Sequence, residues 1–370
     1  MKKINFVDLR KQYELIKEEI DSAIAESLEK TDFILGEKVS EFEDILSKYT
    51  STEALTVANG TDALFISLKS LGIKEGDEVI IPSFTWVSTA EAVKLLGGIP
   101  IYVDIREDTF NINEQEVKKK LTDNSKVIMP VSIFGRCCNL TELSNIAKEN
   151  NLKLIEDAAQ SYGAKHQGMM SCSIADISTT SFFPAKPLGC YGDGGAIFAK
   201  DQDKMEEIRM ISRHGQKERY NYKRVGVNSR LDTLQARILI EKHKIFEKEI
   251  SRRNIIAERY NRNLKDYLQI KCPEIPNEEN RSVWAQYTII LDQKLADKRT
   301  EIMKRLQERG IPTALYYPAP IHKQKPYLSS DILPVTEDLA TRVLSLPMHP
   351  YLGSEEVDYI SDELIQLIKI

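Results

Sequence analysis

Short apolar runs alternate with segments of helical periodicity through the first half of the chain. The apolar runs have the length of buried strands and lie at residues 78–81, 101–105, 127–133 and 152–156. Between them, apolar side chains recur at helical spacing at residues 89–96, 114–121 and 142–149. This alternation predicts βαβ units, and hence an α/β fold whose mainly parallel sheet is covered by helices on both faces. Further strands are expected at residues 177–183 and 196–199.

The pattern changes after about residue 234. The elements predicted there are a long charged helix through residue 264, a break rich in proline and glutamate at 273–280, a strand at 284–291 and a helix at 295–309. We therefore predict a large domain of residues 1–234 and a smaller C-terminal α/β domain of residues 235–370. A helical segment at about residues 9–49 is expected to pack across both parts.

Composition narrows the class of protein. The 370 residues are 42% hydrophobic, which is enough for a large core. The net charge of −5 gives no general attraction to nucleic acid or membrane, and no apolar stretch is long enough to cross a bilayer. The five cysteines and five histidines show no metal-binding spacing. We expect a cytoplasmic protein without a metal site and without a nucleic-acid or membrane partner.

One lysine, Lys186, lies between a β-type run and a glycine-rich turn in the segment STTSFFPAKPLGCYGDGG. Pro184 and Pro187 stiffen the chain on both sides of it. Burial lowers the pKa of a lysine, and the neutral amine can form a Schiff base with a carbonyl such as that of pyridoxal phosphate. The alternative is a lysine that reaches solvent from an ordinary turn. The cofactor hypothesis requires an anionic partner for the pyridine nitrogen, a phosphate site and a flat group against the ring.

The segment KLIEDAAQ, residues 153–160, ends an apolar strand in acidic residues. In an open parallel sheet, ligand groups gather at this end of the strands. Asp157 is the candidate partner for the ring nitrogen, and Glu156 is expected to face the other side of the sheet because strand neighbours alternate. Capping of the following segment is the alternative role for the acid.

The segment ANGTDAL, residues 58–64, leads into a predicted helix. Gly60 and Thr61 lie at its N-terminus, where free N–H groups, the helix dipole and a hydroxyl form an anion site suited to the cofactor phosphate. Many ordinary helices also begin with threonine or aspartate. Trp86 or Phe84, in the segment PSFTW, is the candidate for the flat group, with packing in the core as the alternative.

The segments NGTDAL, PSFTW, EDAAQ, SFFPAK, GDGG and GVNSRL, in this order, resemble those of the DegT/DnrJ/EryC1/StrS sugar aminotransferases, and the likeness covers nearly the whole chain. The resemblance implies a fold type I aminotransferase that depends on pyridoxal 5'-phosphate. It implies that Lys186 binds the cofactor covalently, that Asp157 contacts the ring nitrogen, and that Gln160 and Trp86 lie against the ring.

The resemblance also implies how the cofactor phosphate is held. Gly60, Thr61 and Ser181 would contact the phosphate, and Asn228 would arrive from the other subunit of a homodimer. The expected reaction is a ping-pong transamination with Lys186 as the base.

The lysine loop reads FPAKPLGCYG, where many members of the family have a YPGKN version. With the segments RHGQ, NSRLDTLQA and SLPMHPYL, it is similar to bacterial aminotransferases that act on UDP-2-acetamido-2-deoxy-3-oxo-glucuronate. This likeness implies glutamate as the amino donor, a nucleotide-linked ketosugar as the acceptor, and a 3-amino sugar for O-antigen or another surface polysaccharide. A dTDP-3-oxo- or 4-oxo-6-deoxyhexose is the alternative acceptor.

Residues 213–230 carry six basic side chains and one acid, Glu218. An anion is expected to bind there, with Arg230 as the first choice to hold a nucleotide diphosphate or a sugar carboxylate. A solvated charged surface is the alternative. The resemblance assigns Tyr316, Tyr317 and His322 to substrate contact across the dimer, whereas the tyrosines taken alone indicate packing at the end of a strand.

Three other classes of protein are disfavoured. In a dehydratase of the same fold, histidine stands at the position of Lys186. A nicotinamide oxidoreductase would read residues 189–195 as a dinucleotide loop, but the G-x-G-x-x-G pattern is missing and a strand is predicted after the loop in place of a helix. A non-catalytic interaction protein would not need Asp157, Gln160, Ser181 and Lys186 together.

Overall fold

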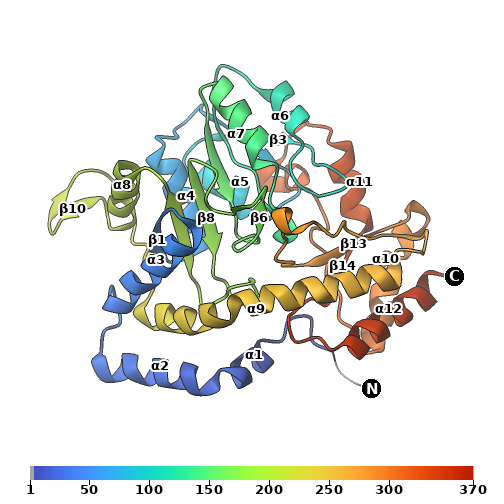
Figure 1. Ribbon diagram of the computed structural model, residues 1–370. Helices are drawn as coiled ribbons and strands as arrows, with labels where there is room; N and C mark the ends of the chain where they lie inside the picture. Colours follow the sequence, from blue (N-terminus) through green and yellow to red (C-terminus); the bar gives the residue numbers. More distant parts are fainter. Residues whose placement is uncertain (1–3, 370) are drawn as a thin grey trace.

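A seven-stranded sheet lies at the centre of the molecule (Figure 1). The computed structural model describes residues 4–369. In spatial order the strands are β1 (Glu53–Val57), β9 (Gly195–Ala199), β8 (Ile177–Ser181), β5 (Lys153–Asp157), β4 (Ser125–Ile128), β2 (Glu78–Pro82) and β3 (Ile99–Val103). Only β9 is antiparallel to its neighbours in this sheet, so the predicted mainly parallel α/β fold is confirmed.

Neighbouring residues of each strand point to opposite faces of this sheet, and their apolar side chains form a core on each face. Helices cover both faces because both cores must be shielded from water. Ile80 and Leu154 face one core, whereas Ile81 and Ile155 face the other. The first core is closed by α3 (Glu37–Thr50), α6 (Glu114–Lys120), α7 (Leu140–Glu149) and part of α9 (Thr233–Leu264). The second is closed by α4 (Gly60–Ser70), α5 (Ser88–Leu95) and α8 (Gln202–Ser212).

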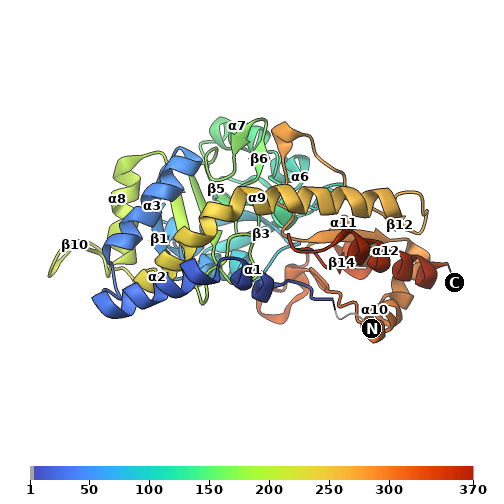
Figure 2. The same cartoon turned by 60° about the horizontal axis from the view of Figure 1, so that its bottom comes forward.

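The C-terminal part has a core of its own around a smaller antiparallel sheet. Its strands are β12 (Ile270–Lys271), β13 (Tyr287–Leu291) and β14 (Val343–Leu346), and its helices are α10 (Arg299–Glu308), α11 (Pro334–Arg342) and α12 (Ser354–Ile368). Figure 2 shows α9 running from the large sheet to this smaller part. The predicted domain boundary between residues 234 and 235 falls inside α9. The division of the chain into two domains at this position stays a prediction.

The N-terminal segment forms α1 (Leu9–Leu15) and α2 (Lys17–Lys30) before α3. Its first residues bond to the smaller part, where the Ile4 amide donates to the Gly310 carbonyl oxygen at 3.1 Å. Glu43, on α3, accepts a hydrogen bond from the Thr56 amide of β1 at 2.8 Å. The bond to the smaller part comes from Ile4, ahead of the predicted segment, so the packing of residues 9–49 across both parts stays a prediction.

Some predicted elements are shorter than the apolar runs indicated. The run at residues 127–133 gives only β4, and a 3-10 turn, Ile133–Gly135, follows. The remaining short strands are β6 (Lys165–His166), β7 (Met169–Met170), β10 (Gln216–Glu218) and β11 (Asn221–Tyr222). Among residues 4–369, no helix is long and apolar enough to cross a membrane.

Candidate active site

Four parallel strands, β1, β2, β5 and β8, bring predicted site residues to one edge of the large sheet. Gly60 and Thr61 follow β1, Trp86 follows β2, Asp157 ends β5 and Ser181 ends β8. Because these strands run in the same direction, their carboxyl ends meet at one edge, which is where ligands bind in open α/β sheets. The sheet thus gathers residues that are more than a hundred positions apart in the sequence.

The loop that carries Lys186 joins two adjacent antiparallel strands. Ser181 and Gly195 are register partners at its ends, and the Phe182 amide donates to the Gly194 carbonyl at 2.8 Å. The Lys186 amide donates to the Phe183 carbonyl at 2.9 Å, which makes a tight turn at the lysine. Surrounding protein desolvates the ammonium form and lowers the pKa of Lys186, an effect that the charge of Asp157 partly opposes. A lowered pKa favours the neutral, nucleophilic amine.

Asp157 is buried at the end of β5. Its Oδ1 accepts a hydrogen bond from the Ala159 amide at 3.1 Å, and its Oδ2 accepts one from Thr89 Oγ1 at 3.2 Å. Desolvation raises the pKa of Asp157, while these two bonds and Lys186 act in the opposite direction. A protonated ring nitrogen would give this buried carboxylate the positive partner that stabilises its charged form.

Glu156 faces the other side of β5, as the alternation of strand residues predicted. Its Oε1 accepts hydrogen bonds from Ser132 and Ser171 at 2.9 and 2.8 Å, and its Oε2 accepts one from the Cys172 amide at 2.9 Å. The two neighbouring acids therefore have separate surroundings, and only Asp157 faces Lys186.

The N-terminus of α4 forms a cradle for an anion. Asn59 caps the helix by accepting a hydrogen bond from the Asp62 amide at 2.8 Å, and the amides of Gly60 and Thr61 have no acceptor within an α-helix because they belong to its first turn. A Cβ added to Gly60 would lie 2.8 Å from Ser181 Cβ, so the glycine keeps open the space between the helix and Ser181. These residues fit a phosphate group.

Gln160 links the sheet edge to Tyr317 of the smaller part. Its Nε2 donates to the Tyr317 hydroxyl at 3.1 Å, while its Oε1 accepts a hydrogen bond from the Phe134 amide at 2.8 Å. Trp86 has 61% of its surface exposed and its ring centroid lies 6.4 Å from that of Tyr317, whereas Phe84 is buried in the core. Trp86 is therefore the aromatic side chain that is free to cover a ligand.

Asn228 and Arg230 lie on the segment that passes beside α4. Between them, the Ser229 hydroxyl accepts a hydrogen bond from the Ala58 amide at 3.0 Å. Asn228 is exposed and Arg230 is partly buried. Burial and the neighbouring charges of Arg209 and Arg230 lower the pKa of Arg213, and Glu43 partly opposes this shift. Glu43 is paired with Arg209 at 3.5 Å, which leaves Arg213 and Arg230 as the candidates to bind an anion.

His322 is not brought to the site within this chain. It has 0% of its surface exposed, and its ring nitrogens are hydrogen-bonded to Ser83 Oγ at 2.7 Å and to Glu337 Oε1 at 3.0 Å. Tyr316 lies nearer, with its ring 5.9 Å from that of Tyr317. The assignment of these residues to substrate contact stays a prediction.

Sequence reasoning missed Ser88 and Thr89, which support the site from the start of α5. Ser88 Oγ shares a hydrogen bond with Thr61 Oγ1 at 2.7 Å, and Thr89 holds Asp157. Their only signal was the run of hydroxyl residues around Trp86 at the carboxyl end of a predicted strand. That signal does not tell which hydroxyl points inward.

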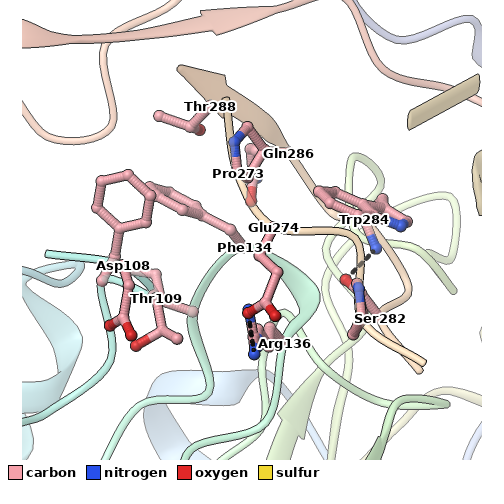
Figure 3. A pocket seen from close by; sticks show the side chains of 13 residues that line it. Asp108, Thr109, Phe134, Arg136, Pro273, Glu274, Ser282, Trp284, Gln286 and Thr288 are labelled. Atoms are coloured by element: carbon pink, nitrogen blue, oxygen red, sulfur yellow. Dashed lines mark hydrogen bonds and ion pairs between the residues drawn. The ribbon is translucent and has the colours of Figure 1, made fainter. Parts of the chain in front are cut away.

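A separate cavity of about 30 Å³ lies between the two parts of the chain (Figure 3). Phe134, Trp284 and Arg136 line it, and Arg136 pairs with Glu274 at 2.9 Å. The cavity has room for one or two water molecules. Lys186 and Asp157 do not line it, so it is distinct from the lysine site.

The fold and the site define an enzyme that uses pyridoxal phosphate. A loop lysine with a lowered pKa, a buried carboxylate and a helix N-terminus that fits a phosphate group lie at the carboxyl edge of a mainly parallel sheet. The sequence pattern of the DegT/DnrJ/EryC1/StrS aminotransferase family matches residues 14–365, and the chain belongs to this family. It is a pyridoxal-phosphate-dependent aminotransferase, as the resemblance predicted.

Relatives in this family have related activities. The chain is 46% identical to the UDP-2-acetamido-2-deoxy-3-oxo-D-glucuronate aminotransferase of Pseudomonas aeruginosa, over 96% of this chain and 98% of the relative. It is 34% identical to a dTDP-3-amino-3,4,6-trideoxy-alpha-D-glucose transaminase of Streptomyces venezuelae, over 95% of this chain and 92% of the relative. The structure of S. venezuelae DesV in complex with a ketimine intermediate superposes with a TM-score of 0.95 at 32% identity, with both chains covered completely.

Proposed function

We propose that the enzyme transfers an amino group from glutamate to UDP-2-acetamido-2-deoxy-3-oxo-glucuronate and forms the 3-amino sugar used for O-antigen or another surface polysaccharide. The observation that carries this choice is the likeness to the P. aeruginosa relative over nearly the full length of both chains. The guanidinium groups of Arg213 and Arg230 support an acceptor that carries negative charge. We place the reaction in the cytoplasm.

Pyridoxal phosphate, when bound, supplies an aldehyde for amines and a ring that withdraws electrons from the reacting carbon. Lys186 would hold the cofactor, and its amine would move the proton from the α-carbon of glutamate to the cofactor, which takes up the amino group. Asp157 would accept a hydrogen bond from the ring nitrogen and favour its protonated form. In the second half-reaction Lys186 would move a proton from the cofactor to the sugar carbon that receives the amino group.

The remaining residues hold and orient the reactants. Gly60, Thr61 and Ser181 would bind the phosphate at the start of α4, and Gln160 and Trp86 would lie against the ring. Thr89 keeps Asp157 in position through its bond of 3.2 Å. Because Gln160 is fixed by Phe134 and Tyr317, it presents one orientation to the ring.

We also propose that two chains form a homodimer with shared active sites. Asn228 is exposed although it lies on a segment that is anchored beside α4 through Ser229. Exposure of an amide in this position is consistent with a role in the phosphate site of a second subunit. Arg230 is the expected contact for the anionic groups of the substrate, and Tyr316, Tyr317 and His322 are the expected substrate contacts across the dimer, although the ring of His322 is buried in this chain.

A dTDP-linked 3-oxo- or 4-oxo-6-deoxyhexose is the second candidate acceptor, and the 34% identity to the Streptomyces transaminase favours it. An oxidoreductase is disfavoured further, because the glycines at residues 192–195 lead into β9 and not into a helix. The two sugars differ in the carboxylate of the uronate, which a guanidinium can bind with paired hydrogen bonds.

The absorption spectrum of the purified protein tests the proposal first. Glutamate should bleach the band of the lysine-bound cofactor, and reduction with borohydride followed by peptide mass analysis should place the cofactor on Lys186. The UDP-3-oxo-uronate should then restore the band faster than dTDP-3-oxo- and 4-oxo-hexoses. Faster restoration by a dTDP-sugar would overturn the choice of acceptor, and a label on another lysine would overturn the role of Lys186.

A further inference from the structure

Lys242, in the middle of α9, is almost completely buried, with 1% of its surface exposed. Its Nζ donates a hydrogen bond to the Gly189 carbonyl oxygen and lies 4.9 Å from the centroid of the Tyr191 ring. Both contacts are made with the loop that carries Lys186. Lysines are rarely buried without a specific partner, so these two contacts account for the position of this side chain.

Gln235 lies seven residues before Lys242, on the same face of α9. Its Oε1 accepts a hydrogen bond from the Tyr191 amide at 2.8 Å, and its Nε2 donates to the Tyr191 carbonyl at 3.2 Å. A Cβ added to Gly192 would lie 3.1 Å from this Nε2, so the glycine leaves room for the side-chain amide. The helix therefore holds residues 189–192 at two points.

Gly189, which α9 holds in place, packs directly on the residues that precede Lys186. A Cβ added to Gly189 would lie 2.5 Å from the Pro184 carbonyl oxygen and 2.6 Å from that of Phe183. The Phe183 carbonyl in turn accepts the bond from the Lys186 amide at 2.9 Å. A movement of Gly189 away from α9 would therefore remove the support of the turn at Lys186.

We propose that Lys242, together with Gln235, is a positioning residue that fixes the loop so that the Lys186 amine faces Asp157 and the cofactor. The inference rests on the role of Lys186 proposed above. A loop that is already ordered loses less conformational entropy when the cofactor binds, so the clamp from α9 raises the affinity for the cofactor. Neither residue touches the reacting atoms.

The burial of Lys242 is consistent with an amine that holds the loop in place and takes no part in the reaction. Desolvation lowers the pKa of Lys242 to about 8, although Glu249 and Cys190 partly oppose the shift. Both the ammonium and the neutral amine can donate to the Gly189 carbonyl. The hydrogen bond to Gly189 therefore persists through the neutral pH range, whereas the attraction to the Tyr191 ring requires the ammonium form.

Lys242→Met tests the proposal because it keeps the length and packing of the side chain and removes the amine. Replacement of a buried charge by an apolar side chain is often tolerated by the fold. The matched control is Lys244→Met, since Lys244 lies on the same helix, is exposed and pairs with Glu241 at 2.5 Å. Hydrogen exchange of the loop amides is measured on the cofactor-free proteins, and binding is measured by titration with pyridoxal phosphate.

We expect exchange at residues 186–192 to become at least about tenfold faster in Lys242→Met, because the loop opens without unfolding of the protein. The dissociation constant for pyridoxal phosphate should rise by about tenfold or more, while Lys244→Met resembles the unmodified protein in both measurements. Unchanged exchange and unchanged cofactor affinity in Lys242→Met would overturn the proposal.

If Lys242→Met does not fold, Gln235→Leu answers the same question, because it removes both bonds to Tyr191 and keeps the lysine. Faster exchange and weaker cofactor binding support the clamp, and the absence of both refutes it. The exchange measurement needs no cofactor, so it is independent of the role of Lys186. The borohydride label on the unmodified protein decides that role separately, which keeps failure of the clamp distinct from failure of the proposed function.

Discussion

Substitution of Gly60 by alanine is the sharpest steric test of the phosphate cradle. The added Cβ would lie 2.8 Å from Ser181 Cβ and 3.3 Å from Ser181 Oγ. Two carbon atoms without a bond between them prefer a separation of about 3.5–4.0 Å, so α4 and the end of β8 must separate by roughly an ångström. The methyl group would also occupy the space between the helix N-terminus and Ser181 in which we place the phosphate.

Overpacking of this kind costs about 1–3 kcal/mol. In the cofactor-free protein the first turn of α4 can shift, and part of the cost is offset because alanine favours a helix more than glycine does. The bound phosphate needs the turn and Ser181 in their original places, so most of the cost falls on binding. Since about 1.4 kcal/mol corresponds to a factor of ten, we expect Gly60→Ala to weaken cofactor binding by roughly 5- to 150-fold.

The assay is a titration of the cofactor-free protein with pyridoxal phosphate, followed by absorbance, together with thermal unfolding of the same samples. Gly353→Ala is the control, because a Cβ there meets its nearest atom, Glu356 Oε2, at 3.5 Å and lies far along the chain at the start of α12. Equal cofactor affinity in Gly60→Ala and the unmodified protein would refute the cradle. A large loss of thermal stability without cofactor would show that the cost falls on the fold instead.

The other predictions concern charge and protonation. Lys186→Ala should abolish the spectral change that glutamate produces, and substantial turnover in this variant would contradict its role as the base. Asp157→Asn should lower turnover by about ten- to a hundredfold, since a hydrogen bond to a charged group contributes about 1.5–3 kcal/mol, and the rate of the glutamate half-reaction measures this. Burial raises the pKa of Glu156 above its ordinary value of 4.5. The folded state therefore binds more protons than the unfolded state between these two pKa values. As a result, the free energy of unfolding should fall as the pH rises from about 4.5 through the raised pKa. Glu156→Gln should reduce this slope in urea unfolding, and an unchanged slope would assign it to other groups. Arg230→Ala should raise KM for the UDP-sugar by about tenfold or more and leave the rate of the glutamate half-reaction unchanged. The control is Lys200→Ala, at an exposed position before α8, which should change neither the KM nor the rate of the half-reaction.

Much of the site was predictable because its residues belong to short segments with local meaning. Lys186 stands between a strand and a glycine turn, Asp157 ends an apolar strand, and Gly60 begins a helix. Each of these segments indicates a candidate role from its own residues, without information about the segments that pack against it in the fold. The resemblance to an aminotransferase family then added Gln160, Ser181 and Asn228, which no local pattern distinguishes from other polar residues.

Other features depend on contacts between distant segments. Ser88 and Thr89 are two hydroxyl residues among many until α5 packs beside α4 and β5 and brings them to Thr61 and Asp157. The residues alone left open the choice between Trp86 and Phe84, the resemblance pointed to Trp86, and the fold agrees because Phe84 is buried and Trp86 is exposed. The burial of His322 against Ser83 and Glu337 could not be read from its surroundings in the chain.

The sequence by itself determined the alternation of strands and helices and the type of sheet, and it indicated the candidate roles of the lysine and the carboxylate, because periodicity and residue type act over a few neighbouring positions. Only the tertiary structure decided that β9 runs against its neighbours, that α9 crosses the predicted domain boundary, and that Lys242 reaches back to Gly189. These features arise when segments far apart in the chain are packed together, and the free energy of that packing depends on contacts that no local window of sequence contains.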